Sequence, residues 1–303
     1  MSTNCAHTTV AALALLVAAT AAHAGAFQQQ VAADPHGEVD VSNVAGSILI
    51  SGWDQPLVAV SADVSGEDPR IRVSSGHGRT RICVVYGSGG CDSGNSYGSE
   101  HSVRLQLHVP RGSQIDASAV SATLSSHGIT GGQHLHTVSG DIAADLGSGN
   151  NDVKSVSGNI DLQGSGVDGT IHVSSVSGDL TVKNVAGELE ARTVNGRVGA
   201  ELASARIVRL NTTSGPIDLR ARLARGGSIE TETVSGSARL HISAPAGYTY
   251  AAQSFSGDID DCFGQRSERS QYGPGNRLDG TRAAGGGDVR IRTLSGNISL
   301  CDH

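Results

Sequence analysis

A short element with the pattern Thr/Ser-Val-Ser-Gly recurs along the C-terminal part of the chain and constrains its fold more than any other feature. The steps between consecutive repeat glycines are 18, 20, 18, 19, 21, 21 and 39 residues. Because the last step is about two periods, we expect one long insertion within it. Serial units of this length without intervening helices predict a solenoid, in which each unit adds one coil. The repeat glycines are Gly140, Gly158, Gly178, Gly196, Gly215, Gly236, Gly257 and Gly296.

Apolar residues alternate with polar ones on both sides of each repeat glycine. Around Gly158, for example, Val153 precedes it by five positions, and Ile160 and Leu162 follow it by two and four. Period-two alternation is typical of strands with one buried face. The positions five and two before the glycine are both apolar, so we expect the strand to bend near the Ser-Gly step. The pattern therefore predicts an all-β fold, a parallel β-helix or solenoid of roughly 20-residue coils. Aromatic residues are only 3% of the chain, so its core must be aliphatic.

Polar side chains test this register. Stacked coils lie about 4.8 Å apart, so equivalent positions should form vertical columns. We expect cross-strand charge pairs in two of these columns and a hydrogen-bonding ladder of the Thr or Ser three positions before the glycine. The column six positions before the glycine is His134, Asp152, His172, Glu190, Arg209 and Glu230. The column five positions after it includes Lys183, Glu201 and Arg220.

Four cysteines remain after an expected N-terminal signal is removed, and an even number in an exported chain indicates two disulfides. Cys262 and Cys301 each stand five positions after a repeat glycine, so they share a column in adjacent coils. Stacked neighbours meet the Cα separation that a disulfide needs, which predicts the bond Cys262–Cys301. By elimination, Cys83 pairs with Cys91. Zinc is the alternative, although no Cys-x-x-Cys spacing supports it.

The chain divides into three predicted parts. Residues 1–24 resemble a signal peptide, with an apolar run and a small-x-small cleavage pattern at Ala22-His23-Ala24. Residues 25–115 contain irregular strands that we expect to form an N-terminal β-strand cap, and residues 116–303 carry the solenoid with an inserted loop at 264–287. The net charge of −7, without a polybasic patch, argues against a nucleic-acid partner. The signal predicts export, so we expect a periplasmic or cell-surface protein. No later run is long enough to span a membrane, so we expect no integral membrane segment in the mature chain.

Several motifs together resemble one family. They are Asn43-Val44-Ala45-Gly46-Ser47-Ile48, Gly52-Trp53-Asp54, the Val-Pro-x-Gly step at Val109–Gly112, and the serial Ser-Gly-Asp/Asn-Ile units. The chain, over about Asp40 to Leu300, resembles the DUF4097 family of bacterial β-repeat proteins, also called "putative adhesins". The resemblance implies a β-helix-like fold and an envelope location, and it carries over no catalytic residue.

Three groups of polar side chains could bind a metal ion or act in catalysis. Oxygen ligands directly after the glycines could hold Ca²⁺ in stacked turns, although solvated turns also favour Asp and Asn. Histidines near one another could bind a transition metal, and carboxylates sharing one column could cleave polysaccharide. The oxygen ligands are Asp141, Asn159, Asp179, Asp258 and Asn297. The histidines are His134, His136 and His172, and the carboxylates are Asp161, Asp218 and Asp260.

None of these patterns forms a convincing site in the sequence, so we expect a non-catalytic protein without a cofactor or metal. The favoured hypothesis is an envelope or surface interaction scaffold of adhesin type, which binds a protein or glycan through many weak contacts along regular faces. Two alternatives stay open: a periplasmic accessory of envelope-stress signalling, and a polysaccharide-active β-helix enzyme.

Overall fold

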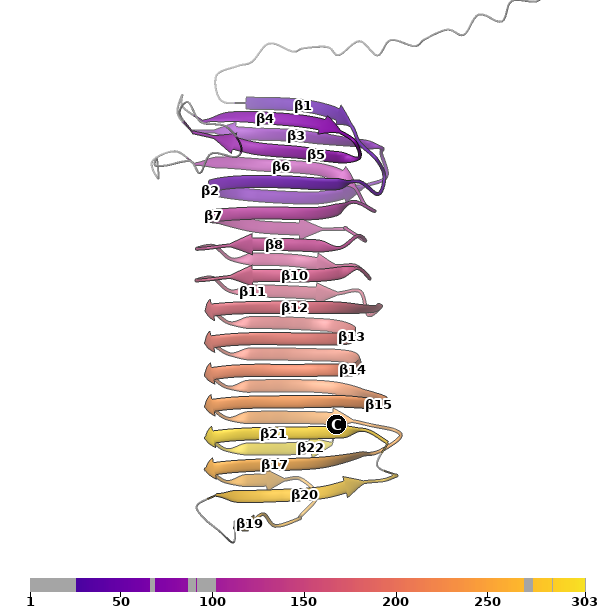
Figure 1. Ribbon diagram of the computed structural model, residues 1–303, viewed down its shortest axis with the longest axis vertical. Helices are drawn as coiled ribbons and strands as arrows, with labels where there is room; N and C mark the ends of the chain where they lie inside the picture. The colour runs from indigo at the N-terminus through magenta and orange to yellow at the C-terminus, as the bar shows by residue number, and fades with distance from the viewer. Residues whose placement is uncertain are drawn as a thin grey trace, which may run out of the picture.

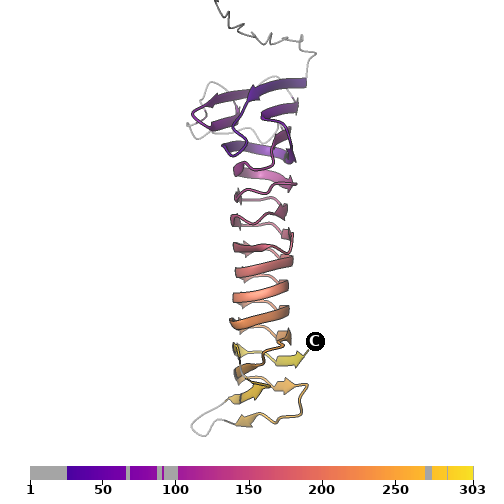
Figure 2. The ribbon, with the colours of Figure 1, turned by 90° about the vertical axis from the view of Figure 1, so that its right-hand side faces the viewer.

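The computed structural model describes residues 26–65, 69–86, 91, 102–269, 275–284 and 286–302. In these residues the regular secondary structure is entirely β-strand, which confirms the all-β class. The strands stack into one long column (Figure 1). Seen from its narrow side, the column is two layers thick over most of its length (Figure 2). The expected signal peptide lies outside the described residues, and the described part contains no helix that is long and apolar enough to cross a membrane.

Each repeat forms one coil of this column. The strands of the central coils are β7 (Gln114–His127), β8 (Gln133–Thr137), β9 (Ile142–Leu146), β10 (Asn150–Ser155), β11 (Ile160–Gly164), β12 (Asp168–Ser177), β13 (Leu180–Asn195), β14 (Val198–Ser214), β15 (Ile217–Ser235) and β16 (Ala238–Ser243). The segments before the repeat glycines form one layer, the pre-glycine sheet, and the segments after them form the other, the post-glycine sheet. Pairing is parallel and in the expected register: Val153 lies between Leu135 and Val173.

The N-terminal strands close one end of the column. They are β1 (Ala26–Ala32), β2 (Glu38–Trp53), β3 (Leu57–Val64), β4 (Arg70–Gly76), β5 (Arg79–Val85) and β6 (Val103–Pro110). Strand β2 pairs in parallel with β7 over both sheets, so β2 already forms a complete coil within the predicted cap. Beyond it, β6, β3 and β1 extend the post-glycine sheet, with antiparallel pairing from β6 outward. Strands β5 and β4 extend the pre-glycine sheet.

The C-terminal coils do not follow chain order. Their strands are β17 (Tyr248–Ser256), β18 (Ile259–Asp261), β19 (Glu268–Arg269), β20 (Asn276–Arg282), β21 (Asp288–Ser295) and β22 (Ile298–Asp302). Strand β21 pairs with β15 on one side and with β17 on the other. The Gly296 coil is therefore inserted between the Gly236 and Gly257 coils, as Figure 1 shows. The Gly257 coil therefore ends the column, and β20, from the insertion at 264–287, pairs antiparallel with β17 and extends the pre-glycine sheet beyond it.

The repeat glycines are required by close approach between coils. A Cβ atom on Gly158 would lie 2.0 Å from the carbonyl oxygen of Gly140, and one on Gly236 would lie 2.0 Å from that of Gly215. These glycines do not have the left-handed backbone that usually selects glycine. The chain turns from one sheet to the other at this corner, and the corners of successive coils stack directly on one another. Glycine is thus the residue that allows the coil spacing.

The inner faces of the two sheets form one aliphatic core that runs along the column. The Thr or Ser three positions before each glycine also points inward and is nearly buried. Where these hydroxyls form hydrogen bonds, they donate to a glycine carbonyl of the neighbouring coil: Ser254 Oγ lies 3.0 Å from the Gly296 oxygen, and Thr193 Oγ1 lies 3.4 Å from the Gly178 oxygen. The expected ladder is therefore only partly formed: Thr193, Thr212, Ser254 and Thr293 donate to backbone and not to one another, and the hydroxyls of Thr137, Ser155, Ser175 and Thr233 have no hydrogen-bond partner among the described residues.

Both predicted cysteine pairs lie at disulfide distance. The Cα atoms of Cys262 and Cys301 are 4.9 Å apart, and those of Cys83 and Cys91 are 5.8 Å apart. Cys262 follows β18 and Cys301 lies in β22, so this bond ties the inserted coil to the coil that ends the column. The repeat register thus places two residues 39 positions apart in direct contact.

Candidate functional site

Exposed apolar side chains form a vertical row on the pre-glycine sheet, two positions before each corner. Eight of the nine members are aliphatic or aromatic, and each of these eight is between 42% and 52% exposed. We call this set the apolar row. In stacking order its members are Val120, Val138, Val156, Val176, Val194, Thr213, Val234, Leu294 and Phe255.

The bend lies where the sequence predicts it, near the Ser-Gly step, but the Val two positions before the glycine faces solvent instead of joining the core. The strand keeps its alternation through the position three before the glycine, which is buried, and the next residue therefore faces solvent. The corner comes one residue later, at the Ser-Gly step itself. Strict alternation counted from the buried position five before the glycine would have placed the Val outside, because the two positions are an odd number of residues apart.

A second row, of cationic side chains, runs beside the apolar row. It lies two residues further from the corner, four positions before the glycine in the Gly140, Gly158, Gly196 and Gly296 coils, whereas Ser174, Asn211, Glu232 and Gln253 hold this position in the other coils. The strand pairing brings Arg277 of β20 into line opposite Gln253. Three of its members carry salt bridges to acids on their own strand: Lys154 to Asp152 at 2.6 Å, Arg192 to Glu190, and Arg277 to Asp279. These cations are still about half exposed. We call the set His136, Lys154, Arg192, Arg292 and Arg277 the cationic row.

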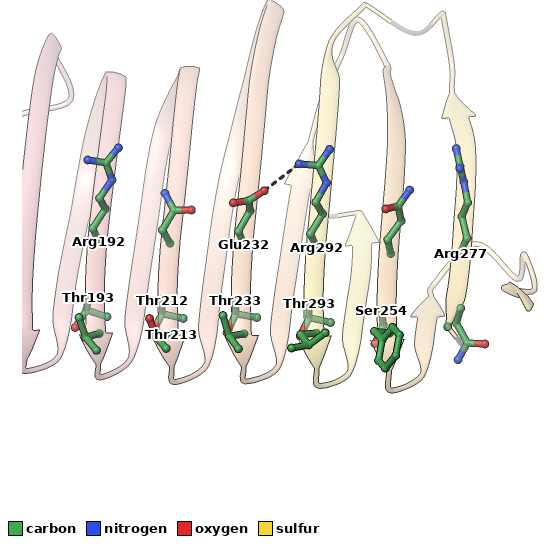
Figure 3. Close-up of a pocket in the computed structure, with 18 of the residues that line it drawn as sticks. Arg192, Thr193, Thr212, Thr213, Glu232, Thr233, Ser254, Arg277, Arg292 and Thr293 are labelled. Atoms are coloured by element: carbon green, nitrogen blue, oxygen red, sulfur yellow. Dashed lines mark hydrogen bonds and ion pairs between the residues drawn. The ribbon is translucent and has the colours of Figure 1, made fainter. Parts of the chain in front are cut away.

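A groove of about 1400 Å³ lies along these two rows at the C-terminal half of the column. The inward Thr and Ser residues lie at its floor, with Val194, Val234, Leu294 and Phe255 on one side. Figure 3 shows Arg192 of β13, Glu232 of β15, Arg292 of β21 and Arg277 of β20 along the other side. Arg292 Nη1 lies 3.0 Å from Glu232 Oε1 of the neighbouring coil. Four arginines and two glutamates line the groove, so it is positively charged in a chain of net charge −7.

The Asp and Asn residues that follow the glycines have a structural use. The Asp141 Oδ1 atom accepts the backbone N–H of Asn159 at 2.8 Å, and Asn159 Oδ1 accepts that of Asp179 at 3.0 Å. The same bond joins Asp179 to Arg197, and Asn297 to Asp258. Each side chain thus satisfies a corner N–H of the adjacent coil, which explains the Asp/Asn preference without a cation.

The histidines lie in the expected columns. Asp152 is paired in register with His134 on one side and His172 on the other. His172 Nδ1 lies 3.1 Å from Glu190 Oε2, so this column contains one cross-strand charge pair when the histidine is protonated. Within the residues that the structure describes, no three His, Cys, Asp or Glu side chains form a group that could hold a metal ion.

The three carboxylates of the enzyme hypothesis share a row on the post-glycine sheet but lie far apart. Asp161 is separated from Asp218 by Thr181 and Gly199, so the two are three coil steps, about 14 Å, apart. Paired glycosidase carboxylates are about 5–9.5 Å apart. Asp218 is also held between Arg197 at 3.2 Å and Arg239 at 3.3 Å.

Tyrosines fill the core where the column ends. The hydroxyl of Tyr248 donates to Asp302 Oδ1 at 3.0 Å, and Arg282 lies 2.7 Å from the other oxygen of the same carboxylate. Burial, followed by the interaction with Asp302, raises the pKa of Tyr248 well above its usual value. Burial also raises the pKa of Tyr250. The aromatic ring of Phe263 packs against Tyr250 and under the Arg282 guanidinium. This cluster closes the core beneath the terminal coils.

The solved structures that are similar to this chain include three proteins, each with low identity to it. A "putative adhesin" from Bacteroides fragilis NCTC 9343 is 10% identical, with 93% of this chain and 98% of that chain covered and a TM-score of 0.41. A "putative cell adhesion protein" from Clostridium sporogenes ATCC 15579 is 12% identical, with 92% and 100% covered and a TM-score of 0.23. A "putative lipid binding protein" from Parabacteroides distasonis ATCC 8503 is 13% identical, with 92% and 97% covered and a TM-score of 0.31.

The search of curated proteins finds no match. The family comparison is decisive, because one family model matches residues 71–301, which is most of the chain. That segment includes the central coils, the inserted C-terminal coil and part of the N-terminal strands. The chain therefore belongs to the Toastrack DUF4097 family.

Proposed function

We propose that this protein is an exported, non-catalytic interaction scaffold of the cell envelope, adhesin-like in action, which holds its partner along one outer face of a β-solenoid. The apolar row is the observation that carries the proposal. It places half-exposed apolar side chains in eight of nine successive coils. Contiguous exposed apolar surface is uncommon on soluble proteins and marks interaction sites.

The stacked coils make this surface suitable for binding through many weak contacts. Parallel pairing on both sides fixes each strand, so the row is ordered before a partner arrives. A preorganised surface loses less conformational entropy on binding than a flexible one. The row can therefore engage an elongated partner, with each coil adding a small contribution.

Two further observations fit the proposal. Disulfides form and persist in oxidising compartments, and two cysteine pairs lie at disulfide distance. The polar groups with the best claim to chemistry already have structural partners: Asp218 is held by two arginines, and the Asp and Asn side chains at the corners accept backbone N–H groups. These partnerships support a binding surface rather than a reaction centre.

The test is capture of envelope components by the immobilised protein. A variant with Val138→Ser, Val156→Ser and Val176→Ser interrupts the apolar row outside the groove, and we expect it to lose most of the captured material. The matched control carries Lys183→Ser, Glu201→Ser and Arg220→Ser on the post-glycine sheet and should capture as the wild type does. Equal capture by both variants, or cleavage of envelope glycans by the purified protein, would overturn the proposal.

A further inference from the structure

Two rows of opposite character run in parallel along the pre-glycine sheet. The apolar row and the cationic row are two residues apart on the same strands, or about 6.7 Å, and the groove lies along both (Figure 3). We propose that the groove binds an amphipathic α-helix of a partner protein, with the helix axis along the column. The apolar ridge of the helix lies on the apolar row, and an acidic ridge faces the cationic row. This inference rests on the proposed scaffold function and names the class of partner.

The distribution of positive charge favours a polymer over a small anionic ligand. The cations of the groove are spread along it: Arg192 lies on β13, Arg292 on β21 and Arg277 on β20, with other strands between them. A ligand with a single anionic group could contact one or two of them at most. A partner that uses the whole row must carry several acidic groups along its own length, next to an apolar edge.

The spacing of the coils then selects a helix. One helical turn rises 5.4 Å, and side chains three and four apart form ridges along it. Against coils about 4.8 Å apart, the ridge drifts by only about 0.6 Å per coil, so about four turns stay within half a coil of register. An extended peptide repeats each side every 6.8 Å or so and loses register after one coil. Binding of an amphipathic helix in an apolar groove is also a common mode of peptide recognition.

The groove is long enough for such a helix. From Ser174 of β12 to Arg277 of β20 it crosses seven paired strands, or six steps, which is about 29 Å. A helix of about 19 residues has this length. The four turns that stay in register therefore fit within the groove, with room at each end for flanking residues.

Charge complementarity decides the sign of the partner. The groove is positive while the chain as a whole has a net charge of −7, so an acidic helix is repelled by the rest of the surface and attracted to the groove. The three arginines are exposed but each already has a carboxylate partner: Arg292 is paired with Glu232 at 3.0 Å, Arg192 with Glu190, and Arg277 with Asp279. Because exposed salt bridges are weak, the acidic ridge of the helix must compete with a neighbouring carboxylate at each of these positions.

The test uses a synthetic 18-residue helical peptide with a Leu ridge and an adjacent Glu ridge, titrated against the full protein. Two control peptides have the same Leu ridge with Lys in place of Glu, and the same composition in scrambled order. We expect the acidic amphipathic peptide to bind at least tenfold more tightly than either. Equal binding of the Lys peptide, or binding of phosphatidylglycerol vesicles without binding of the acidic peptide, would overturn the inference.

Protein variants locate the contact. The double variant Arg192→Glu and Arg277→Glu should weaken binding of the acidic peptide at least tenfold, while Arg220→Glu on the opposite sheet should leave it unchanged. A second double variant, Val194→Ser with Leu294→Ser, leaves the charges in place and should also weaken binding. Thermal unfolding of each variant checks that the column is intact. Unchanged binding in either folded double variant contradicts the inference.

A photo-crosslinker in place of Thr213, at the polar gap of the apolar row, tests the same idea on envelope extract. We expect crosslinks to a segment with apolar residues spaced three and four apart and Asp or Glu along one edge. Crosslinks to this protein itself, or to segments without that pattern, would refute the helix. Loss of envelope capture in the groove variants without such a segment would leave the scaffold function standing and reject only this partner class.

Discussion

Substitution of a single corner glycine tests the close stacking of the coils most directly. In Gly158→Ala, the added Cβ would lie 2.0 Å from the Gly140 carbonyl oxygen, whereas ordinary contact begins at 3.4 Å, so the two coils must separate by about 1.4 Å. The corner hydrogen bonds between neighbouring coils, such as Asp141 to Asn159 at 2.8 Å, would be stretched by such a shift. Backbone atoms, and not a flexible side chain, block the methyl group, so relaxation is difficult.

We therefore expect Gly158→Ala to lower the free energy of unfolding by about 2–4 kcal/mol. This range begins within the usual cost of overpacking, about 1–3 kcal/mol, and extends above it. For a chain of this size, that corresponds to a fall in Tm of about 3–7 °C. Urea unfolding followed by far-ultraviolet circular dichroism gives the free energy, and a thermal scan gives Tm.

The matched control is Gly199→Ala, in β14. Its added Cβ would come no closer than 3.8 Å to any atom of another residue beyond its chain neighbours, at the Leu180 carbonyl oxygen. Replacement of a glycine at a compatible position usually stabilises a protein by about 0.4–1 kcal/mol, through the unfolded state. Gly199→Ala should thus be neutral or slightly stabilising. If Gly158→Ala were as stable as this control, the carbonyl contact would not be the reason for the repeat glycine.

Three further predictions concern the corners and the end of the column. Replacement of Cys262 and Cys301 by Ser should cost about 4 kcal/mol, against about 2.5 kcal/mol for the other pair, because the two bonds close loops of 39 and 8 residues; equal losses in urea unfolding would argue against this account. Asp179→Ala should lower the free energy of unfolding by about 1 kcal/mol, because it removes the acceptor of the Arg197 N–H, whereas Asp179→Asn should keep most of this stability. Equal unfolding midpoints for the two variants would contradict this role of Asp179. The raised pKa of Tyr248 means that the folded state binds the phenolic proton more tightly than the unfolded state, in which tyrosines ionise at about pH 10. The contribution of this proton to folding stability is therefore complete below that pH and is lost as the pH rises above it. We expect Tm to fall less steeply with alkaline pH in Tyr248→Phe than in the wild type. An equal slope of Tm against pH in the two proteins would refute the raised pKa of Tyr248.

The sequence predicts the register between neighbouring coils well, because the close contact at each corner requires a glycine in every unit. From that register follow the column of Asp152 with His134 and His172, and the proximity of Cys262 to Cys301. The candidate site was harder to find. Its apolar side chains were counted with the core, because Val is typical of buried strand positions, and only strict alternation separates the two faces.

The order of the C-terminal coils could not be read from the repeat. Each unit presents the same corner and the same aliphatic ladder, so the Gly236 coil can stack equally well on either of the two later coils. The choice is made by the insertion, whose strand β20 pairs antiparallel with β17 and so occupies the far side of that coil. An insertion without an apolar alternation of its own gives no sign of this pairing in the sequence.

This order matters for the proposed binding surface. In chain order, Glu232 and Arg292 are separated by an intervening coil, yet stacking makes them neighbours with a 3.0 Å salt bridge. The large apolar members Leu294 and Phe255 are likewise brought together at the end of the groove by the inserted coil. The apolar row therefore continues in space through coils that are not consecutive in the chain. The bond between Cys262 and Cys301 holds the inserted coil against its neighbour, so the same link that stabilises the end of the column also preserves the face on which we place the partner.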